Sequence, residues 1–275
     1  MRESPYPSRT LGELEGAVIA WLEAERRPVV SVRDVSEVFA LTPSSIRDVL
    51  SRLERKGWLR RTANGRYETV LAATGGFAPP NPWAALSTWR QPYYVAFQSA
   101  AYEHNLTPDR PAAVQVAVPV GARAPKAWEL VPVVLVVLRE FSAEGVNDEE
   151  RHGVTVRLAS PERVLVDGAA LPRRIGGALG LARIASRTVD TVDWDRVVEL
   201  ARKRPAGAAA LRRLAATLDL LDIDVPAPLA NAAATNGSYL YLGERRLYGA
   251  RGPRLTRWAV VDNVGVETLL EEIGR

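Results

Sequence analysis

Residues 44–68, SSIRDVLSRLERKGWLRRTANGRYE, restrict the fold more than any other stretch of this chain. Four apolar residues recur with the i, i+3, i+4, i+7 spacing of one buried helix face: Ile46, Val49, Leu50 and Leu53. Gly57 is typical of a helix end, and Asn64-Gly65 is typical of a tight hairpin turn. The stretch therefore predicts a helix that ends near Lys56 and is followed by a β-hairpin.

Two further helices are predicted before this one. Apolar residues between Leu11 and Leu22 recur at helical spacing until Pro28 ends the segment. A second helix is predicted over residues 32–40, with Ser31 as its cap. Three of its residues are expected to face inward: Val35, Val38 and Phe39.

The sequence LTPSS predicts a tight turn before the third helix. Pro43 is expected to end one helix, and Ser44 or Ser45 to cap the next. The order helix, helix, turn, helix and hairpin predicts a winged helix-turn-helix over residues 1–75.

Positive charge is concentrated in this segment. Residues 42–67 carry a local net charge of +5, whereas the whole chain carries +4 and the remainder −1. The basic side chains are 33 Arg against 3 Lys, and the guanidinium group suits phosphate contacts. We therefore expect an electrostatic surface for nucleic acid near the third helix.

Reading of the DNA major groove requires polar side chains on the outer face of such a helix. That face is predicted to carry Ser44, Ser45, Arg47, Asp48 and Ser51. The other basic and wing residues are predicted to contact phosphate or the adjacent minor groove: Arg52, Arg55, Lys56, Arg60, Arg61, Asn64 and Arg66. The alternative is a protein-docking module whose arginines form a solvated face.

A Gly- and Pro-rich linker within residues 74–81 is predicted to separate this domain from a second one over residues 76–275. A short helix, a strand and another helix are expected at 83–89, 93–97 and 99–104, before half to fully buried strands at 112–120, 130–141 and 154–159. From Ile175 the pattern is helical, until short strands around 238–242 and 257–262. The predicted class is α+β, with a mixed sheet and helices to about 190 and mainly helices after it.

The sequence LASPERVLVD contains a standard helix start. Ser160 is expected to cap the helix, with Pro161 at its first position and Glu162 in its first turn. Arg163 and Asp167 are spaced i, i+4 and can form an ion pair. We interpret these residues as structural first, fixing a helix against the sheet, and as partner-facing second.

No catalytic constellation is found, so no enzyme activity, metal or cofactor is predicted. The chain has no cysteine, and its two histidines, His104 and His152, have no obvious nucleophile partner. Two acidic triplets are better explained as helix ends than as Mg²⁺ ligands: Asp190, Asp193, Asp195 and Asp219, Asp222, Asp224. The glycines of GGALG, at 176, 177 and 180, favour a tight turn and close helix packing over phosphate binding.

Several segments in order resemble one family. The segments are YYVAFQSAAYEHNLT, VQVAVP and GVTVRLASPERVLVDGAALP, followed by a turn at Gly176-Gly177. On these segments, residues 30–185 resemble the AbiEi-type antitoxins. The sequence LASPER with Asp167 is the most specific part. His104-Asn105 departs from the pattern, in which a glycine follows the histidine, and residues after about 190 match less well.

The resemblance implies an antitoxin that represses its own transcription at inverted repeats in double-stranded promoter DNA. It also implies that the protein neutralises a nucleotidyltransferase-like toxin, either by binding it directly or without forming a complex with it. Such pairs are associated with phage defence. A ligand-responsive winged-helix regulator of a metabolic operon is the alternative. Composition favours a cytoplasmic protein, because the longest apolar run, residues 130–138, is too short to cross a membrane. Both a monomer and a dimer remain compatible with the sequence.

Overall fold

The computed structural model describes residues 10–62, 65–70 and 80–274. The chain divides into two compact units. One comprises residues up to 92 with 121–133 and 148–156, and the other comprises 93–120, 134–147 and the chain from 157. Most of the predicted linker at 74–81 lies outside the described residues, so the domain limits of 1–75 and 76–275 stay a prediction.

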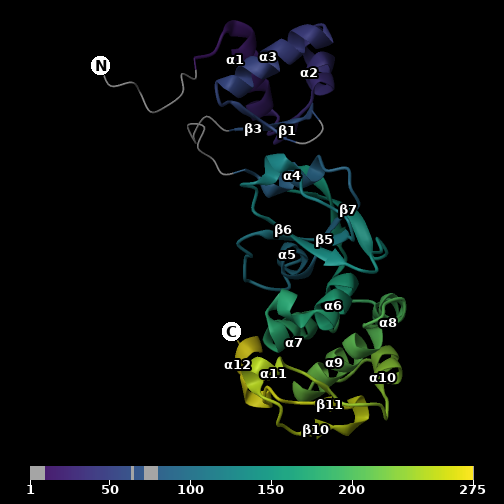
Figure 1. Cartoon of the computed structure of the whole chain (residues 1–275). Helices are drawn as coiled ribbons and strands as arrows, with labels where there is room; N and C mark the ends of the chain where they lie inside the picture. Colours follow the sequence, from purple (N-terminus) through teal and green to yellow (C-terminus); the bar gives the residue numbers. More distant parts are fainter. Residues whose placement is uncertain (1–9, 63–64, 71–79, 275) are drawn as a thin grey trace. The chain divides into compact units, whose positions relative to one another are not determined.

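The first unit begins with three helices that lie on one face of a small sheet (Figure 1). The helices are α1 (Glu13–Ala24), α2 (Val32–Phe39) and α3 (Pro43–Arg55). The strands β1 (Val29–Val30), β2 (Leu59–Arg61) and β3 (Tyr67–Thr69) pair antiparallel in the order β1-β3-β2. The three helices and the two hairpin strands therefore follow one another as predicted.

The apolar faces of these elements form one core. The four predicted inward residues of α3 are at most 2% exposed. The prediction for Val38 is wrong, because this side chain is 51% exposed. The buried stripe of α2 runs through Val35 and Phe39, one turn apart, and Phe39 packs edge-on against Trp21.

Ser31 caps α2 as predicted, since its hydroxyl accepts the Asp34 amide at 3.3 Å. The predicted cap of α3 is wrong. Thr42 caps α3 by accepting the Ser45 amide at 3.3 Å, and Pro43 is the first residue of α3 rather than the end of α2. Proline fits this position because the first amides of a helix have no partner within it.

A five-stranded sheet has the strand order β6-β5-β4-β8-β7. Its strands are β4 (Tyr94–Val95), β5 (Val114–Pro119), β6 (Val133–Leu138), β7 (Val146–Arg151) and β8 (Val154–Ala159). The sequence analysis missed β7, VNDEER, because an edge strand can carry charges instead of a β-branched run. Strand β6 is the other edge and lies at the less buried end of the expectation, since Val136 is its only buried residue.

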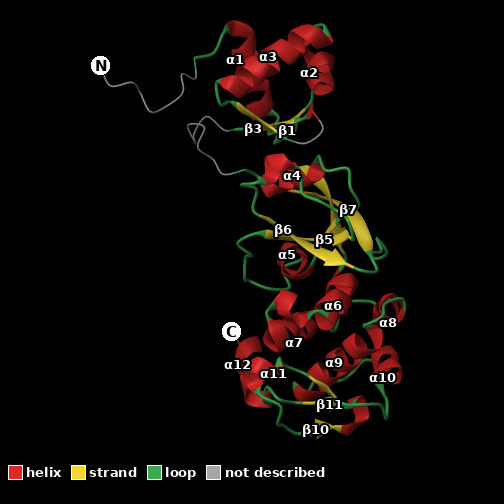
Figure 2. Cartoon of the chain, in the orientation of Figure 1, coloured by secondary structure: helices red, strands yellow, loops and turns green. Residues whose placement is uncertain are grey.

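Helices dominate the second unit (Figure 2). They are α5 (Phe97–Glu103), α6 (Pro161–Ala170), α7 (Gly177–Thr188), α8 (Trp194–Arg202), α9 (Gly207–Leu220) and α10 (Ala227–Ala233). Helix α6 is central, because it packs against α5, α7, α8 and α9. Short helices link these elements or precede the sheets: α4 (Pro82–Ser87), η3 (Lys126–Trp128) and η4 (Pro172–Ile175).

The chain finishes with a small three-stranded sheet, in the order β10-β11-β9. Its elements are β9 (Leu240–Tyr241), α11 (Arg245–Tyr248), β10 (Arg254–Leu255), η5 (Thr256–Trp258) and β11 (Val260–Val261). The predicted mixture of helices and strands is confirmed, but the final helix, α12 (Val266–Ile273), was not predicted. No helix within the described ranges is long and apolar enough to cross a membrane.

Candidate nucleic-acid interface

The outer face of α3 presents the polar residues that the sequence analysis selected for base contact. Ser44, Ser45, Arg47, Asp48 and Ser51 are all exposed, while the apolar residues of α3 point into the core. At the start of the helix, the hydroxyls of Ser44 and Ser45 lie 3.0 and 2.8 Å from the Thr42 hydroxyl. These exposed polar groups can contact an anion or a base edge.

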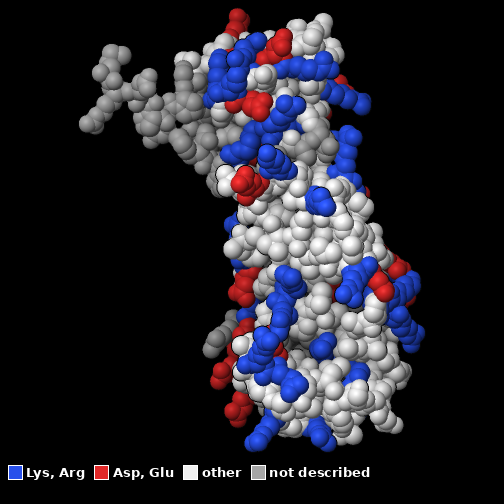
Figure 3. Space-filling view, viewed as in Figure 1, with Lys and Arg blue, Asp and Glu red and all other residues white. Residues whose placement is uncertain are grey.

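The basic residues predicted to contact DNA fall into two groups. Four are exposed and have no carboxylate partner within the described ranges: Arg47, Arg55, Arg61 and Arg66. Three others are half-buried and bound to acidic side chains: Arg52 and Lys56 to Glu15, and Arg60 to Glu68. Lys and Arg side chains gather over this part of the chain in Figure 3. Asn64 lies outside the described residues.

Glu15 of α1 holds α3 in place through a contact that the sequence analysis missed. Its carboxylate lies 2.9 Å from Arg52 Nε, accepts a hydrogen bond from Lys56 Nζ and accepts the Gly12 amide at 2.9 Å. The hydrogen bond from Lys56, followed by that from Gly12, lowers the pKa of Glu15 to about 2. Arg52 and Lys56 therefore serve first to join α1 to α3.

Glu15→Gln is expected to lower the free energy of unfolding at pH 7 by about 1–2 kcal/mol, because two ion pairs are lost while their cations can return to water. Since the pKa of the folded state is depressed, the carboxylate stabilises the fold above its unfolded pKa of 4.5 and loses this effect as pH falls toward 2. Urea denaturation should show the two proteins converging over that window. The exposed Glu13→Gln is the control, and a pH-independent difference would contradict the assignment.

Leu158, Ala159 and Arg163 of the LASPER motif are buried, and its other three residues are half-buried at the start of α6. Ser160 caps α6 by accepting the Arg163 amide at 3.3 Å, and it donates to Glu162 at 2.7 Å. The predicted ion pair is present: Arg163 Nε lies 2.9 Å from Asp167 Oδ2, and both side chains are 1% exposed. This geometry supports the structural interpretation of the motif.

Two residues distant in sequence complete this ionic cluster. Tyr94 donates its hydroxyl to Asp167 at 2.8 Å, and Arg204 pairs with the other carboxylate oxygen. Arg163 also donates to the carbonyl of Ser142 at 3.1 Å and to that of Glu144. Burial raises the pKa of both Asp167 and Tyr94, and the Arg163 guanidinium opposes the shift at Asp167.

The histidines and aspartates considered for catalysis lie apart. His104 Nε2 lies 2.7 Å from the Ala159 carbonyl, and His152 stacks on Trp83 with ring centroids 4.6 Å apart. Asp193 caps α8, and Asp219 accepts the Trp258 indole N–H at 2.8 Å. Over the described ranges, no cluster of three or more acidic, histidine or cysteine side chains could hold a metal ion.

Asn105 has φ of +58°, the left-handed conformation that favours glycine. The asparagine that departs from the family pattern therefore keeps the turn after His104, since asparagine tolerates this conformation better than most residues.

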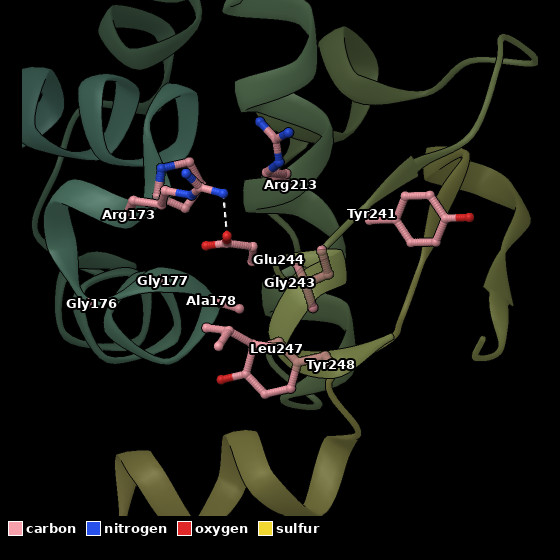
Figure 4. A pocket seen from close by; sticks show the side chains of 12 residues that line it. Arg173, Gly176, Gly177, Ala178, Arg213, Tyr241, Gly243, Glu244, Leu247 and Tyr248 are labelled. Carbon is pink, nitrogen blue, oxygen red and sulfur yellow. Dashed lines mark hydrogen bonds and ion pairs between the residues drawn. The ribbon is translucent and has the colours of Figure 1, made fainter. Parts of the chain in front are cut away.

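A second candidate site is a cavity of about 410 Å³ beside the start of α7 (Figure 4). Its lining includes Gly176 and Gly177, two arginines and two tyrosines: Arg173, Arg213, Tyr241 and Tyr248. Arg173 pairs with Glu244 across one side. Gly180 confirms the expected close packing, because a Cβ there would overlap the Ile175 carbonyl. A Cβ on Gly177 would meet no atom within 4 Å, so its backbone borders open space.

Arg213 makes this cavity chemically distinctive. Its guanidinium donates to the Ala169 carbonyl at 2.9 Å, but its buried Nε has no partner within the described ranges. Burial lowers the pKa of Arg213, and the neighbouring Arg212 adds to the effect. A small anion in the cavity would offset this uncompensated charge.

No family model matches the chain, and no curated protein matches it either. Among solved structures, it is similar to the crystal structure of the RV2827C protein from Mycobacterium tuberculosis, with a TM-score of 0.68, 20% identity and 99% of each chain covered. At this level of identity the likeness shows a shared fold and carries no function.

Proposed function

We propose that residues 10–70 form a winged helix-turn-helix that binds double-stranded DNA, with α3 in the major groove and the β2–β3 hairpin as the wing. One observation carries this proposal: α3 buries its apolar face completely and presents on the opposite face exposed hydroxyls and guanidiniums, and these guanidiniums have no carboxylate partner among the described residues. An arginine there can donate two hydrogen bonds to guanine, and the wing arginines can contact phosphate.

The biological role that we propose is that of a non-enzymatic antitoxin and transcriptional autorepressor. The resemblance of residues 30–185 to AbiEi-type antitoxins supports it, with its most specific motif at Leu158–Arg163. The partner would be a nucleotidyltransferase-like toxin encoded in the same operon. Co-expression with such a neighbouring gene should restore growth that the toxin alone arrests, and continued arrest at equal expression would refute this role.

Gel-shift titration with the DNA upstream of the protein's own gene tests the DNA-binding proposal. We expect a retarded band that persists with excess scrambled competitor. Equal competition by scrambled and upstream DNA would show binding without sequence preference and would contradict repression at a defined operator.

A second candidate function is that of a ligand-responsive regulator of a metabolic operon. The cavity around Arg213 favours it, because its volume and its mixture of arginine, tyrosine and bare backbone suit a small anionic molecule. If this is the function, a metabolite from the neighbouring operon should change the affinity for upstream DNA, and Arg213→Met should remove that response. An unchanged response in this variant would exclude the cavity.

A further inference from the structure

Positive charge recurs near the end of the chain. Residues 239–258 contain five arginines and one acid, a local net charge of +4. Outside this segment and residues 42–67, the rest of the chain carries −5. Positive charge is therefore concentrated in two segments and not in the N-terminal one alone, because the net charge of −1 outside residues 42–67 conceals a second basic segment.

We propose that these five arginines form a second nucleic-acid-binding surface that contacts the phosphodiester backbone. The C-terminal arginine surface consists of Arg245, Arg246, Arg251, Arg254 and Arg257, all exposed. Figure 3 shows basic side chains over α11 and the β10-β11-β9 sheet. This inference does not depend on the N-terminal interface.

These guanidiniums have no carboxylate partners within the described ranges. The only acid of the segment, Glu244, pairs instead with Arg173. Other arginines of the same unit behave differently: Arg183, Arg196 and Arg204 each bind at least one carboxylate. The five clustered guanidiniums are therefore available to an external polyanion.

Aromatic rings hold three of the guanidiniums in place. Arg245 lies over Tyr241 at 5.1 Å, Arg254 over Tyr239 at 5.2 Å and Arg257 over Trp258 at 4.4 Å. Stacking restricts the guanidinium plane and leaves its N–H edges free to donate. Less side-chain entropy is then lost when a phosphate binds.

The register of the small sheet places two of these pairs on one face. Val261 is opposite both Arg254 and Tyr241, and side chains directly opposite each other in a sheet point to the same side. Tyr239 directly precedes β9, and the Arg254 guanidinium lies over its ring. The Arg245–Tyr241 and Arg254–Tyr239 pairs thus present their donors together.

The chemistry favours a phosphate backbone over an acidic protein. Guanidiniums cover the rings of Tyr239, Tyr241 and Trp258, so the surface offers no apolar core like that of a protein interface, although Leu247 is 74% exposed beside it. Besides the arginines themselves, only Thr256 of the segment could hydrogen-bond a base edge. We infer contact without sequence preference, to either duplex DNA or RNA.

The test uses the full chain with the N-terminal arginines removed by Arg47→Ala, Arg55→Ala and Arg61→Ala. In this background, Arg245→Ala, Arg254→Ala and Arg257→Ala are added, and fluorescence anisotropy is measured with a scrambled 30-base-pair duplex and a 30-nucleotide single-stranded RNA. We expect at least a ten-fold loss of affinity for one or both probes and a salt slope lower by about 2–3. If affinity is lost for only one of the two probes, the surface binds that type of nucleic acid.

A matched control removes the same charge from exposed positions elsewhere in the unit: Arg110→Ala, Arg139→Ala and Arg174→Ala. Thermal unfolding confirms that each variant is folded. Equal losses in the two triple variants, or no loss on either probe, would overturn the proposal. Loss of binding to polyglutamate without loss on either nucleic acid would also overturn it, by indicating an acidic protein partner.

Discussion

Asp167→Asn alone is expected to lower the free energy of unfolding by about 3–5 kcal/mol. The carboxylate that it removes is 1% exposed and is shared by Arg163 and Arg204. Both guanidiniums would then lack their counter-charge, and Arg163 is itself too deeply buried to recover hydration. Arg163→Met should cost a similar amount, because it leaves Asp167 with a raised pKa and one fewer cation. Urea denaturation at pH 7 measures both.

The double variant Arg163→Met/Asp167→Asn is expected to cost clearly less than the sum of the two single changes, by more than about 1.5 kcal/mol. In the double variant both charges of the Arg163–Asp167 ion pair are gone, so no buried charge of this pair is left without its partner. Tyr94→Phe is the control within the cluster, because it deletes two hydrogen bonds, one to Asp167 and one from Arg163, but no charge, and should cost about 2 kcal/mol. Strict additivity would mean that the pair is not an energetic unit.

Arg55→Ala/Arg61→Ala/Arg66→Ala is expected to reduce DNA affinity about 100-fold at 0.15 M salt and to flatten the salt slope by about three, since each lost phosphate contact contributes roughly 0.9. These three guanidiniums are exposed and have no ion pair with any residue that the structure describes, so they can reach phosphate without breaking one. Anisotropy titrations between 0.05 and about 0.3 M salt measure both quantities.

The control is Arg26→Ala/Arg90→Ala/Arg123→Ala, which removes three exposed charges from the same unit at positions outside the predicted interface. It should leave the slope nearly unchanged. A similar fall in slope for both variants would indicate that net charge, and not this surface, drives binding.

The α3 face could be predicted from sequence because it depends on helical periodicity alone. The outward and inward residues of α3 lie where the spacing placed them, and the Arg163–Asp167 pair follows from the i, i+4 rule. The cap of α3 was misassigned because Thr42, Ser44 and Ser45 are all competent caps, and periodicity does not choose among them.

Other features depend on contacts between segments that no local pattern encodes. Glu15 lies 37 residues before Arg52, and Tyr94 lies 73 residues before Asp167. A local charge count gives every basic side chain within 42–67 the same weight. In the folded protein, however, Arg52, Lys56 and Arg60 form ion pairs with Glu15 and Glu68. The same count, applied only at the N-terminus, overlooked the C-terminal arginines.

The ratio of affinities for upstream and scrambled DNA, measured on the wild type and on Arg47→Ala, tests the central claim most directly. Arg47 is exposed, has no ion pair in the described part of the chain and lies near the start of α3, where it can reach a guanine. We predict a wild-type ratio well above one that falls about 5- to 100-fold in Arg47→Ala, the equivalent of about 1–3 kcal/mol, while the salt slope changes little. A wild-type ratio near one, or an unchanged ratio in the variant, would contradict the assignment of α3 as the helix that reads DNA.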